Sequence, residues 1–443
     1  MLPARIRWLL ISILAVPWAP TAPVCAQSPP GAAQQGTMAI DLKSALQRAR
    51  ENSQQLLSAA LDVAMAREDR SQAKASFLPT LNYLNQYIYT QGNGTPSGVF
   101  VPNDGVHLYN SQAEVHQDLF SPERMAQYRR AIASQSLAAA RKDIVERGLV
   151  ATVVQNYYAA VAAQRRSVNA QRSLDEAQHF VDITVKLEQG GEVAHADVLK
   201  AQLVLQQRQR DLQDAQLSAE KARIALAVLL FPIYRLDFTL VDDLNTVNSL
   251  PAYEEIENTA KAKSPELRAA EESVRQEEFA VAIARAAYLP SITFDYFFGI
   301  SANQFATHDR EGTNLLGSMA QATLHVPVWN WWTTKSKVRQ AGMRRQQAEL
   351  DLELSRRQFI SNLHSLYLEA QSSLSQLDSL RRSSEAAAES LRLTRLRYEA
   401  GEVSVLEVVD AQSTLAQARN AYDDGLSRYR LALANIQTLT GTM

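Results

Sequence analysis

The chain has 443 residues, enough for a large core or for two domains. Its 45 basic and 47 acidic residues leave a net charge of −2, so nothing in the charge indicates a nucleic-acid partner. A single cysteine excludes a disulfide framework and a thiolate metal site.

Residues 1–26 have the pattern of a secretory signal peptide. Arg5 and Arg7 precede an apolar run, and Val24-Cys25-Ala26 fits a small-x-small cleavage site. Attachment of a lipid at Cys25 is an alternative that the residues before the cysteine fit less well. We therefore predict that the protein is exported and loses its signal peptide.

The next segments predict a short leader and two helices. Residues 27–37 are rich in proline, glycine and glutamine and are predicted to be flexible. A helical pattern then begins after Asp41, a candidate N-cap, with Leu42, Ala45, Leu46 and Ala49 on one face. A second helix is predicted from Ser53 to Phe77, because the chain reaches Pro79 there.

Between residues 80 and 120 the hydrophobic period changes to two. Polar and mostly apolar residues alternate over residues 108–120, and residues 81–90 are rich in aromatics. A loop rich in glycine, asparagine and proline separates these two runs. The pattern predicts a β-hairpin over residues 80–120.

A long helical hairpin is predicted over residues 122–231. No proline occurs from Glu123 to Phe231, and the periodicity is helical, with interruptions expected at Gly148 and at Gly190-Gly191. A helix over residues 122–188 would be about 100 Å long at 1.5 Å per residue. That length is typical of a coiled coil or a helical bundle.

The same order of elements then occurs a second time. A β-hairpin is predicted over residues 291–328, with strands at 291–300 and 319–328 and a polar loop between them. A second helical hairpin over residues 330–441 is expected to turn at Gly401. We therefore divide the chain into a first structural repeat, residues 38–231, and a second, residues 232–443.

The two expected turns of the helical hairpins have nearly the same sequence. Residues 187–202 and 397–412 align at an offset of 210 positions. Three consecutive pairs are identical, namely Gly191 with Gly401, Glu192 with Glu402, and Val193 with Val403. We call these two turns the tips.

The sequence also limits how the chain can meet a membrane. After the signal peptide no stretch approaches 18 consecutive apolar residues, which excludes a helical inner-membrane transporter. Four strands of about ten residues are long enough to cross a bilayer when tilted. They cannot close a barrel alone, because open edges in lipid leave backbone groups unpaired, so several chains would have to pool strands. A soluble four-stranded sheet with one buried face is the alternative.

Two groups of side chains near the strands are open to two interpretations. Trp329, Trp331 and Trp332 would form either an aromatic belt at a membrane interface or a packed junction between sheet and helix. His116 and His325 correspond between the repeats. We interpret them as lumen-facing or hydrogen-bonded rather than as metal ligands, since no ligand cluster surrounds them.

Acidic side chains follow the second tip. Glu407 and Asp410 lie three residues apart and share a helix face, while Asp197 and Lys200 occupy the matching positions in the first repeat. In a symmetric oligomer such carboxylates would form rings that concentrate cations at a narrow mouth. A solvated helix face is the alternative.

No catalytic constellation is present in the sequence. It has no nucleophile-elbow serine, no zinc-protease motif and no phosphate-binding loop, so we expect neither catalysis nor a cofactor or metal.

With its two tip motifs, its two Leu-Pro entries into the β-hairpins and its closing Ile436-Gln-Thr-Leu-Thr-Gly441, the chain resembles the outer-membrane factor family. These are the TolC-type channels of Gram-negative bacteria. The resemblance covers the mature chain and implies a mainly α fold with a membrane β-barrel portion. It implies a homotrimer whose chains together form a twelve-stranded barrel in outer-membrane lipid and a twelve-helix tunnel through the periplasm.

The resemblance also implies a function and partners. The channel would be the passive exit duct of a tripartite efflux or type I secretion system, served by an inner-membrane pump of the RND, ABC or MFS type. A periplasmic adaptor would dock on the tips, at Gly190, Gly191, Glu192, Val193, Gly401, Glu402 and Val403.

For the periplasmic gate, the resemblance points to Asp197, Tyr398, Glu407 and Asp410. Asp197 and Tyr398 fall where family members make a closing contact between tip hairpins. Val403 occupies a position where the family pattern has an arginine that helps to lock the closed tip, so the gate is expected to be held differently.

Two rival interpretations remain, a periplasmic adaptor and a structural coiled-coil protein. An adaptor predicts one helical hairpin between soluble β domains, and a coiled-coil protein leaves the alternating strands unexplained. The sequence does not specify the exported substrate or the class of pump.

Overall fold

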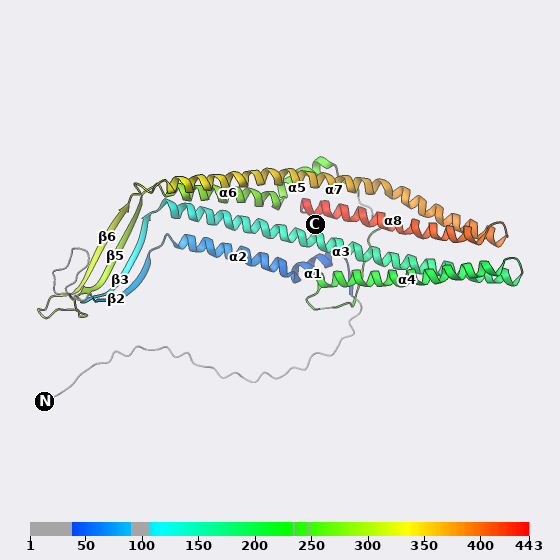
Figure 1. The fold of residues 1–443 in the computed structure, drawn as a ribbon, viewed down its shortest axis with the longest axis horizontal. Helices are drawn as coiled ribbons and strands as arrows, with labels where there is room; N and C mark the ends of the chain where they lie inside the picture. Colours follow the sequence, from blue (N-terminus) through cyan, green and yellow to red (C-terminus); the bar gives the residue numbers. More distant parts are fainter. Residues whose placement is uncertain (1–37, 90–106, 234, 247–248, 443) are drawn as a thin grey trace, which may run out of the picture. The chain divides into compact units, whose positions relative to one another are not determined.

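The computed structural model describes residues 38–89, 107–233, 235–246 and 249–442. The predicted signal peptide, the leader and the loop between the first two strands lie outside these residues. The elements in chain order are β1 (Met38–Ile40), α1 (Leu42–Asn52), α2 (Gln54–Ala75), β2 (Thr80–Tyr89), β3 (His107–Phe120), α3 (Pro122–Gln189), α4 (His195–Leu230), β4 (Phe238–Leu240), α5 (Tyr253–Lys263), α6 (Pro265–Ala286), β5 (Ser291–Ala302), β6 (Leu316–His325), α7 (Thr333–Glu399) and α8 (Val405–Thr440) (Figure 1).

The helices that lead into the two β-hairpins begin in the same way. The Ser53 hydroxyl accepts a hydrogen bond from the Leu56 amide at 3.2 Å, and the Ser264 hydroxyl accepts one from Leu267 at the same distance. Both serines are N-caps, which satisfy backbone donors that a helix leaves free in its first turn. The duplication seen in the sequence is therefore also present in the hydrogen bonding.

Two details of the elements differ from the predictions. Helix α3 runs through Gly148 without a break. One glycine costs only about 1 kcal/mol relative to alanine, which neighbouring good helix formers offset. The last strand was predicted over residues 319–328, but β6 begins at Leu316 and ends at His325. It ends there because His325 pairs with Ser291, the first residue of β5, and because Pro327 has no amide hydrogen to donate.

Four strands form one antiparallel sheet in the order β2-β3-β5-β6. Among the described residues, neither β2 nor β6 has a partner on its outer edge. The register places residues of like polarity in rows across the sheet. One row contains Leu81, Val115, Tyr296 and Ala320, and the next, on the opposite face, contains Thr80, His116, Asp295 and Gln321. The sheet therefore has one mainly apolar and one mainly polar face, as the alternation predicted, with Phe297 and Met319 as apolar residues in the row of Asn82 and Glu114 on the polar face.

His116 lies on the polar face and makes a specific contact there. Its Nδ1 atom is 2.5 Å from Oδ1 of Asp295 on the neighbouring strand. The hydrogen-bonded interpretation of this histidine is therefore confirmed.

The tryptophans after β6 do not form a packed junction with the other described residues. Trp329, Trp331 and Trp332 are 64%, 82% and 63% exposed. They contact one another, with ring centroids 6.0 Å and 5.5 Å from Trp329, and the Lys335 ammonium lies 5.0 Å from the Trp332 ring. Trp331 and Trp332 both have positive φ, a conformation that costs a bulky residue about 1–2 kcal/mol. Any covering of these rings must come from outside the described residues.

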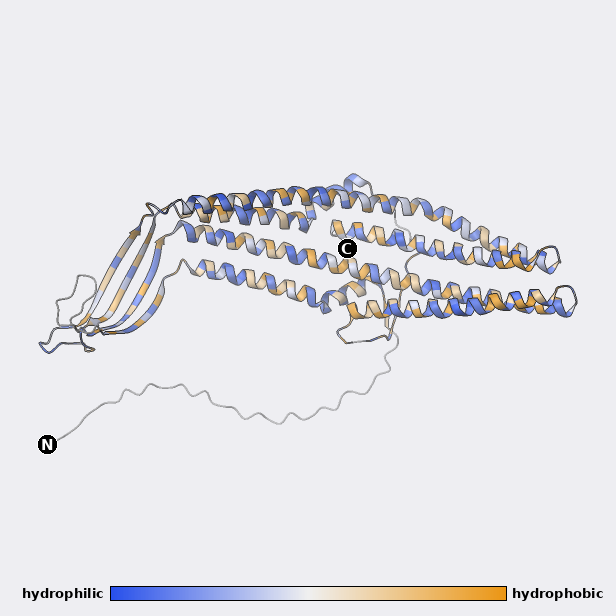
Figure 2. Ribbon diagram, viewed as in Figure 1, coloured by the Kyte–Doolittle hydropathy of each residue, from blue (hydrophilic) through white to orange (hydrophobic). Residues whose placement is uncertain are grey.

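The helices are amphipathic along their length. Figure 2 shows hydrophobic and hydrophilic residues interspersed on every long helix. Within the part of the chain that the structure describes, no helix combines the length and the apolar character needed to cross a membrane. The largest buried cluster lies around α1, α3, α4, α8 and β4, where Tyr157 is 1% exposed and its hydroxyl donates to the Val241 carbonyl at 2.7 Å.

Candidate functional site

Both tips are built by the same set of backbone hydrogen bonds. The amides of Gly191 and Glu192 donate to the carbonyls of Glu188 and Leu187, each at 2.9 Å. In the second tip, the amides of Gly401 and Glu402 donate to the carbonyls of Tyr398 and Arg397, at 3.0 and 2.9 Å. These four residues lie 210 positions after their counterparts in the first tip. This is the Schellman arrangement, in which a left-handed residue ends a helix.

Glycine is needed at the centre of each tip. Gly191 has φ +76° and Gly401 has φ +73°, a region that other residues enter only at a cost. The adjoining Glu192 and Glu402 are exposed, whereas Val193 and Val403 are half-buried. The predicted adaptor contacts thus combine two fixed turns with an exposed carboxylate on each.

The side chains that brace the two tips differ. At the first tip, Nδ1 of His195 lies 2.6 Å from Oε1 of Glu188, and this pair joins α3 to α4. At the second, Nε of Arg397 lies 3.4 Å from Oε2 of Glu402. The residues that match Glu188 and His195 in the second repeat are Tyr398 and Val405, which are buried instead.

An apolar cluster joins the two tips to each other. Tyr398 from α7 is 3% exposed and packs edge-to-face on Phe180 from α3, with ring centroids 5.1 Å apart. Other buried members come from all four helices, and Val193 and Val403 pack against them: Val181, Ala201, Ala387, Leu391, Val405, Val408, Ala411 and Leu415. Val403, in place of the arginine expected from the family pattern, therefore contributes apolar packing.

The hydroxyl of Tyr398 is buried and makes no hydrogen bond among the described residues. Burial raises the pKa of Tyr398, and the negative charge of Asp197 raises this pKa further, whereas Thr184 lowers it. Thr184 uses its own hydroxyl to donate to the Phe180 carbonyl at 2.8 Å. Asp197 thus acts on Tyr398 through its charge. In this single chain the ring of Tyr398, rather than its hydroxyl, joins the two hairpins by its contact with Phe180.

The predicted acidic residues of the second tip are accessible. Glu407 and Asp410 are both exposed, and Asp197 is half-buried. Oε1 of Glu407 also accepts a hydrogen bond from the Ser404 amide at 3.5 Å, at the start of α8. Glu407 therefore has a local structural role besides its charge, and a glutamine at this position would preserve that bond.

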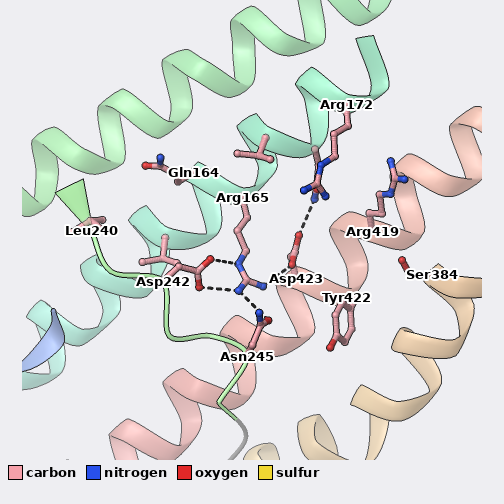
Figure 3. A pocket seen from close by; sticks show the side chains of 13 residues that line it. Gln164, Arg165, Arg172, Leu240, Asp242, Asn245, Ser384, Arg419, Tyr422 and Asp423 are labelled. Atoms are coloured by element: carbon pink, nitrogen blue, oxygen red, sulfur yellow. Dashed lines mark hydrogen bonds and ion pairs between the residues drawn. The ribbon is translucent and has the colours of Figure 1, made fainter. Parts of the chain in front are cut away.

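Farther from the tips along α3 and α8, polar contacts join these two helices around a cavity of about 600 Å³ (Figure 3). Arg165 lies 2.9 Å from Asp423 of α8 and makes two contacts, at 2.5 and 2.8 Å, with Asp242 from the segment after β4. It also donates to Oδ1 of Asn245 at 3.0 Å. Although burial opposes its charge, the bonds to Asp242 and Asp423 raise the pKa of Arg165.

Two of these residues, Phe180 and Arg165, were not found by the sequence analysis. Neither has a matching partner in the other repeat, so the duplication that identified the tips gave no signal for them. No group of His, Cys, Asp and Glu in the described ranges is arranged to hold a metal ion.

A family model described as outer membrane efflux protein matches residues 45–230 and 257–442 of the chain. The pyoverdine export outer membrane protein OpmQ of Pseudomonas aeruginosa is 26% identical over 421 residues, which are 91% of this chain and 84% of that protein. The alkaline protease secretion protein AprF of the same organism is 24% identical over 427 residues, 93% of this chain and 86% of that protein.

Among solved structures, the open state of the MtrE outer membrane channel of Neisseria gonorrhoeae superposes with a TM-score of 0.77. It is 22% identical, and the match covers 90% of this chain and 88% of that one. This similarity shows that the two chains share a fold.

The contact between Phe180 and Tyr398 predicts opposite results for two substitutions. Tyr398→Phe keeps the ring and removes only an unpaired hydroxyl, so we expect the tips to stay as stable as before. Tyr398→Ala removes the ring and should destabilise this cluster by about 3–5 kcal/mol. Limited proteolysis of the tips measures this, with faster cleavage expected only for alanine. Equal acceleration by phenylalanine would show that the hydroxyl holds the tips together.

Proposed function

This chain belongs to the outer membrane efflux protein family, and we propose that three copies assemble into one channel that a periplasmic gate closes. The protein is an outer-membrane channel for efflux or secretion, with a tunnel of helices in the periplasm. The family is one of channel proteins, not of enzymes. One relative exports pyoverdine and another serves protease secretion, so the fold accommodates different cargo.

The observation that carries the assembly is the pair of open edges on the four-stranded sheet. In a bilayer each unpaired backbone group costs several kilocalories per mole, so the edges of β2 and β6 need partners. Pairing β6 of one copy with β2 of the next satisfies both edges when the ring closes. Three copies would supply twelve strands, with the apolar rows toward lipid and the polar rows toward the lumen.

Two helical hairpins in one chain also argue against the rival interpretations. A periplasmic adaptor would have one hairpin between soluble β domains, whereas this chain has two and a sheet with one apolar face. We propose that the tips bind a periplasmic adaptor through their exposed turns, and that an inner-membrane pump delivers cargo to the tunnel.

The native mass of the detergent-extracted outer-membrane protein tests this assembly. We expect a species of about three chain masses that heating converts to the monomer, because inter-chain strand pairing resists detergent until the sheet melts. Native mass spectrometry with and without heating measures both states. A monomer in the soluble periplasmic fraction would contradict the proposal.

The acidic residues at the second tip predict how cations affect the channel. In Glu407→Gln/Asp410→Asn the carboxylate rings are neutralised, while glutamine keeps the bond to the Ser404 amide. We expect block by divalent cations to weaken by about tenfold, since a charged mouth concentrates counter-ions at least this much. Single-channel recording measures the block, and Asp214→Asn, an exposed carboxylate within α4, is the control. Unchanged block would mean that Glu407 and Asp410 are only part of a solvated helix face.

The exposed tryptophans predict contact with lipid. The chain has five tryptophans, and two of them, Trp8 and Trp18, lie in the predicted signal peptide. The tryptophan fluorescence of the mature protein therefore comes from Trp329, Trp331 and Trp332 alone. We expect brominated phospholipids to quench most of it, because indoles favour the membrane interface. Quenching by aqueous iodide but not by brominated lipid would show that the rings lie in water.

A further inference from the structure

The contacts between the first helical hairpin (α3 and α4) and the second (α7 and α8) change in kind from the cavity toward the tips. Near the cavity they form a polar network, in which Asn169 donates to Asp423 at 2.8 Å and to Asn420 at 3.1 Å, beside Arg165. At the tips they are apolar, through Phe180 and Tyr398. One ion pair lies between these two zones, with Nη1 of Arg419 on α8 at 2.9 Å from Oε1 of Glu176 on α3.

The network around Arg165 connects the hairpins through several bonds that share the same groups. Arg165 binds Asp242, Asn245 and Asp423 together, so the segment after β4 is connected to α3 and α8 at one place (Figure 3). The next residue, Asp243, is held from α8 by Arg430 at 2.8 Å. Because several bonds share each of these groups, the network resists a change at any single one of them.

The pair of Glu176 and Arg419 has no such support. Within the described residues, no other ion pair joins the two hairpins between it and the tip turns. Both side chains are about one quarter exposed, so water screens the pair only in part. The Gln412 amide, which donates to the Glu176 carbonyl at 3.4 Å, is a weak neighbour.

We propose that the Glu176–Arg419 pair is a latch between the hairpins, and that the Arg165 network is the pivot about which the second hairpin moves when the tip opens. On α8 the pivot lies at Asp423, 18 residues after the start of the helix at Val405, which gives a lever of about 27 Å at 1.5 Å per residue. A small rotation at the pivot thus becomes a large displacement at Glu407 and Asp410. With the latch broken, the apolar cluster around Tyr398 and the weak bond from Gln412 are the contacts near the tip that oppose this movement among the described residues.

The latch rests on the proposed channel function, and single-channel recording of the full-length protein in planar bilayers tests both. The variants are Glu176→Gln, Arg419→Gln, their combination, and the exchange Glu176→Arg/Arg419→Glu. The control is Arg166→Gln, since Arg166 pairs with Asp424 at 2.7 Å beside the pivot, where Arg165 already holds the helices. All variants must show the wild-type heat-sensitive oligomer, so that loss of folding is recognised.

We expect each single variant to increase the open probability about tenfold, in the range typical of coupled contacts. The double variant should open no more than the single ones, the exchange should restore closure, and the control should behave as wild type. Equal open probabilities in all variants, or additive effects without restoration by the exchange, would overturn the latch. A wild-type protein that forms no channel would instead overturn the proposed function.

Discussion

The open edges of the four-stranded sheet are the constraint on which the rest of this molecule depends. A sheet whose outer strands have no partner among the described residues is satisfied in water by solvent, but lipid offers no hydrogen bonds. In the assembly that we propose, other copies of the chain therefore pair with both edges. The two-faced register, with Tyr296 in an apolar row and Asp295 in a polar one, then decides which side meets lipid and which meets the lumen.

The long helices that follow the β-hairpins extend away from the sheet (Figure 1). Each β-hairpin is followed by a helix of nearly seventy residues, α3 or α7, which returns through a glycine turn into a helix of 36 residues. Each of these helices is too polar to cross a membrane and too long to fit into the core of a compact domain. Packing pairwise, with α3 against α4 and α7 against α8, buries their apolar stripes and leaves polar faces for solvent.

Much of this architecture follows from the sequence because it depends on local chemistry. Gly191 and Gly401 mark turns that only glycine makes easily, and the alternation at residues 291–300 identifies a two-faced strand. The end of β6 at His325 was missed, because it depends on where its partner β5 begins. The division into repeats at residues 38–231 and 232–443 remains an interpretation of the duplication.

The contacts between the hairpins are not predictable in the same way. With 45 basic and 47 acidic residues, the chain offers far too many possible ion pairs for sequence to select Arg419 with Glu176 or Arg165 with Asp242. These partners lie 243 and 77 positions apart, and no period or repeat relates them. The placement of Tyr398 against Phe180 is equally hidden, because the residue that matches Phe180 in the second repeat is Ser390.

The differences between the repeats give the two hairpins different roles. Residues shared by both tips, such as Val198 with Val408 and Ala201 with Ala411, are buried in both and build the common framework. Residues that differ mark what only one hairpin does. The first tip ties its own two helices together through Glu188 and His195, whereas the second places Tyr398 and Val405 at the matching positions, in the cluster it shares with its neighbour. The second tip therefore depends on the first for part of its packing, whereas the pair of Glu188 and His195 acts within the first hairpin alone.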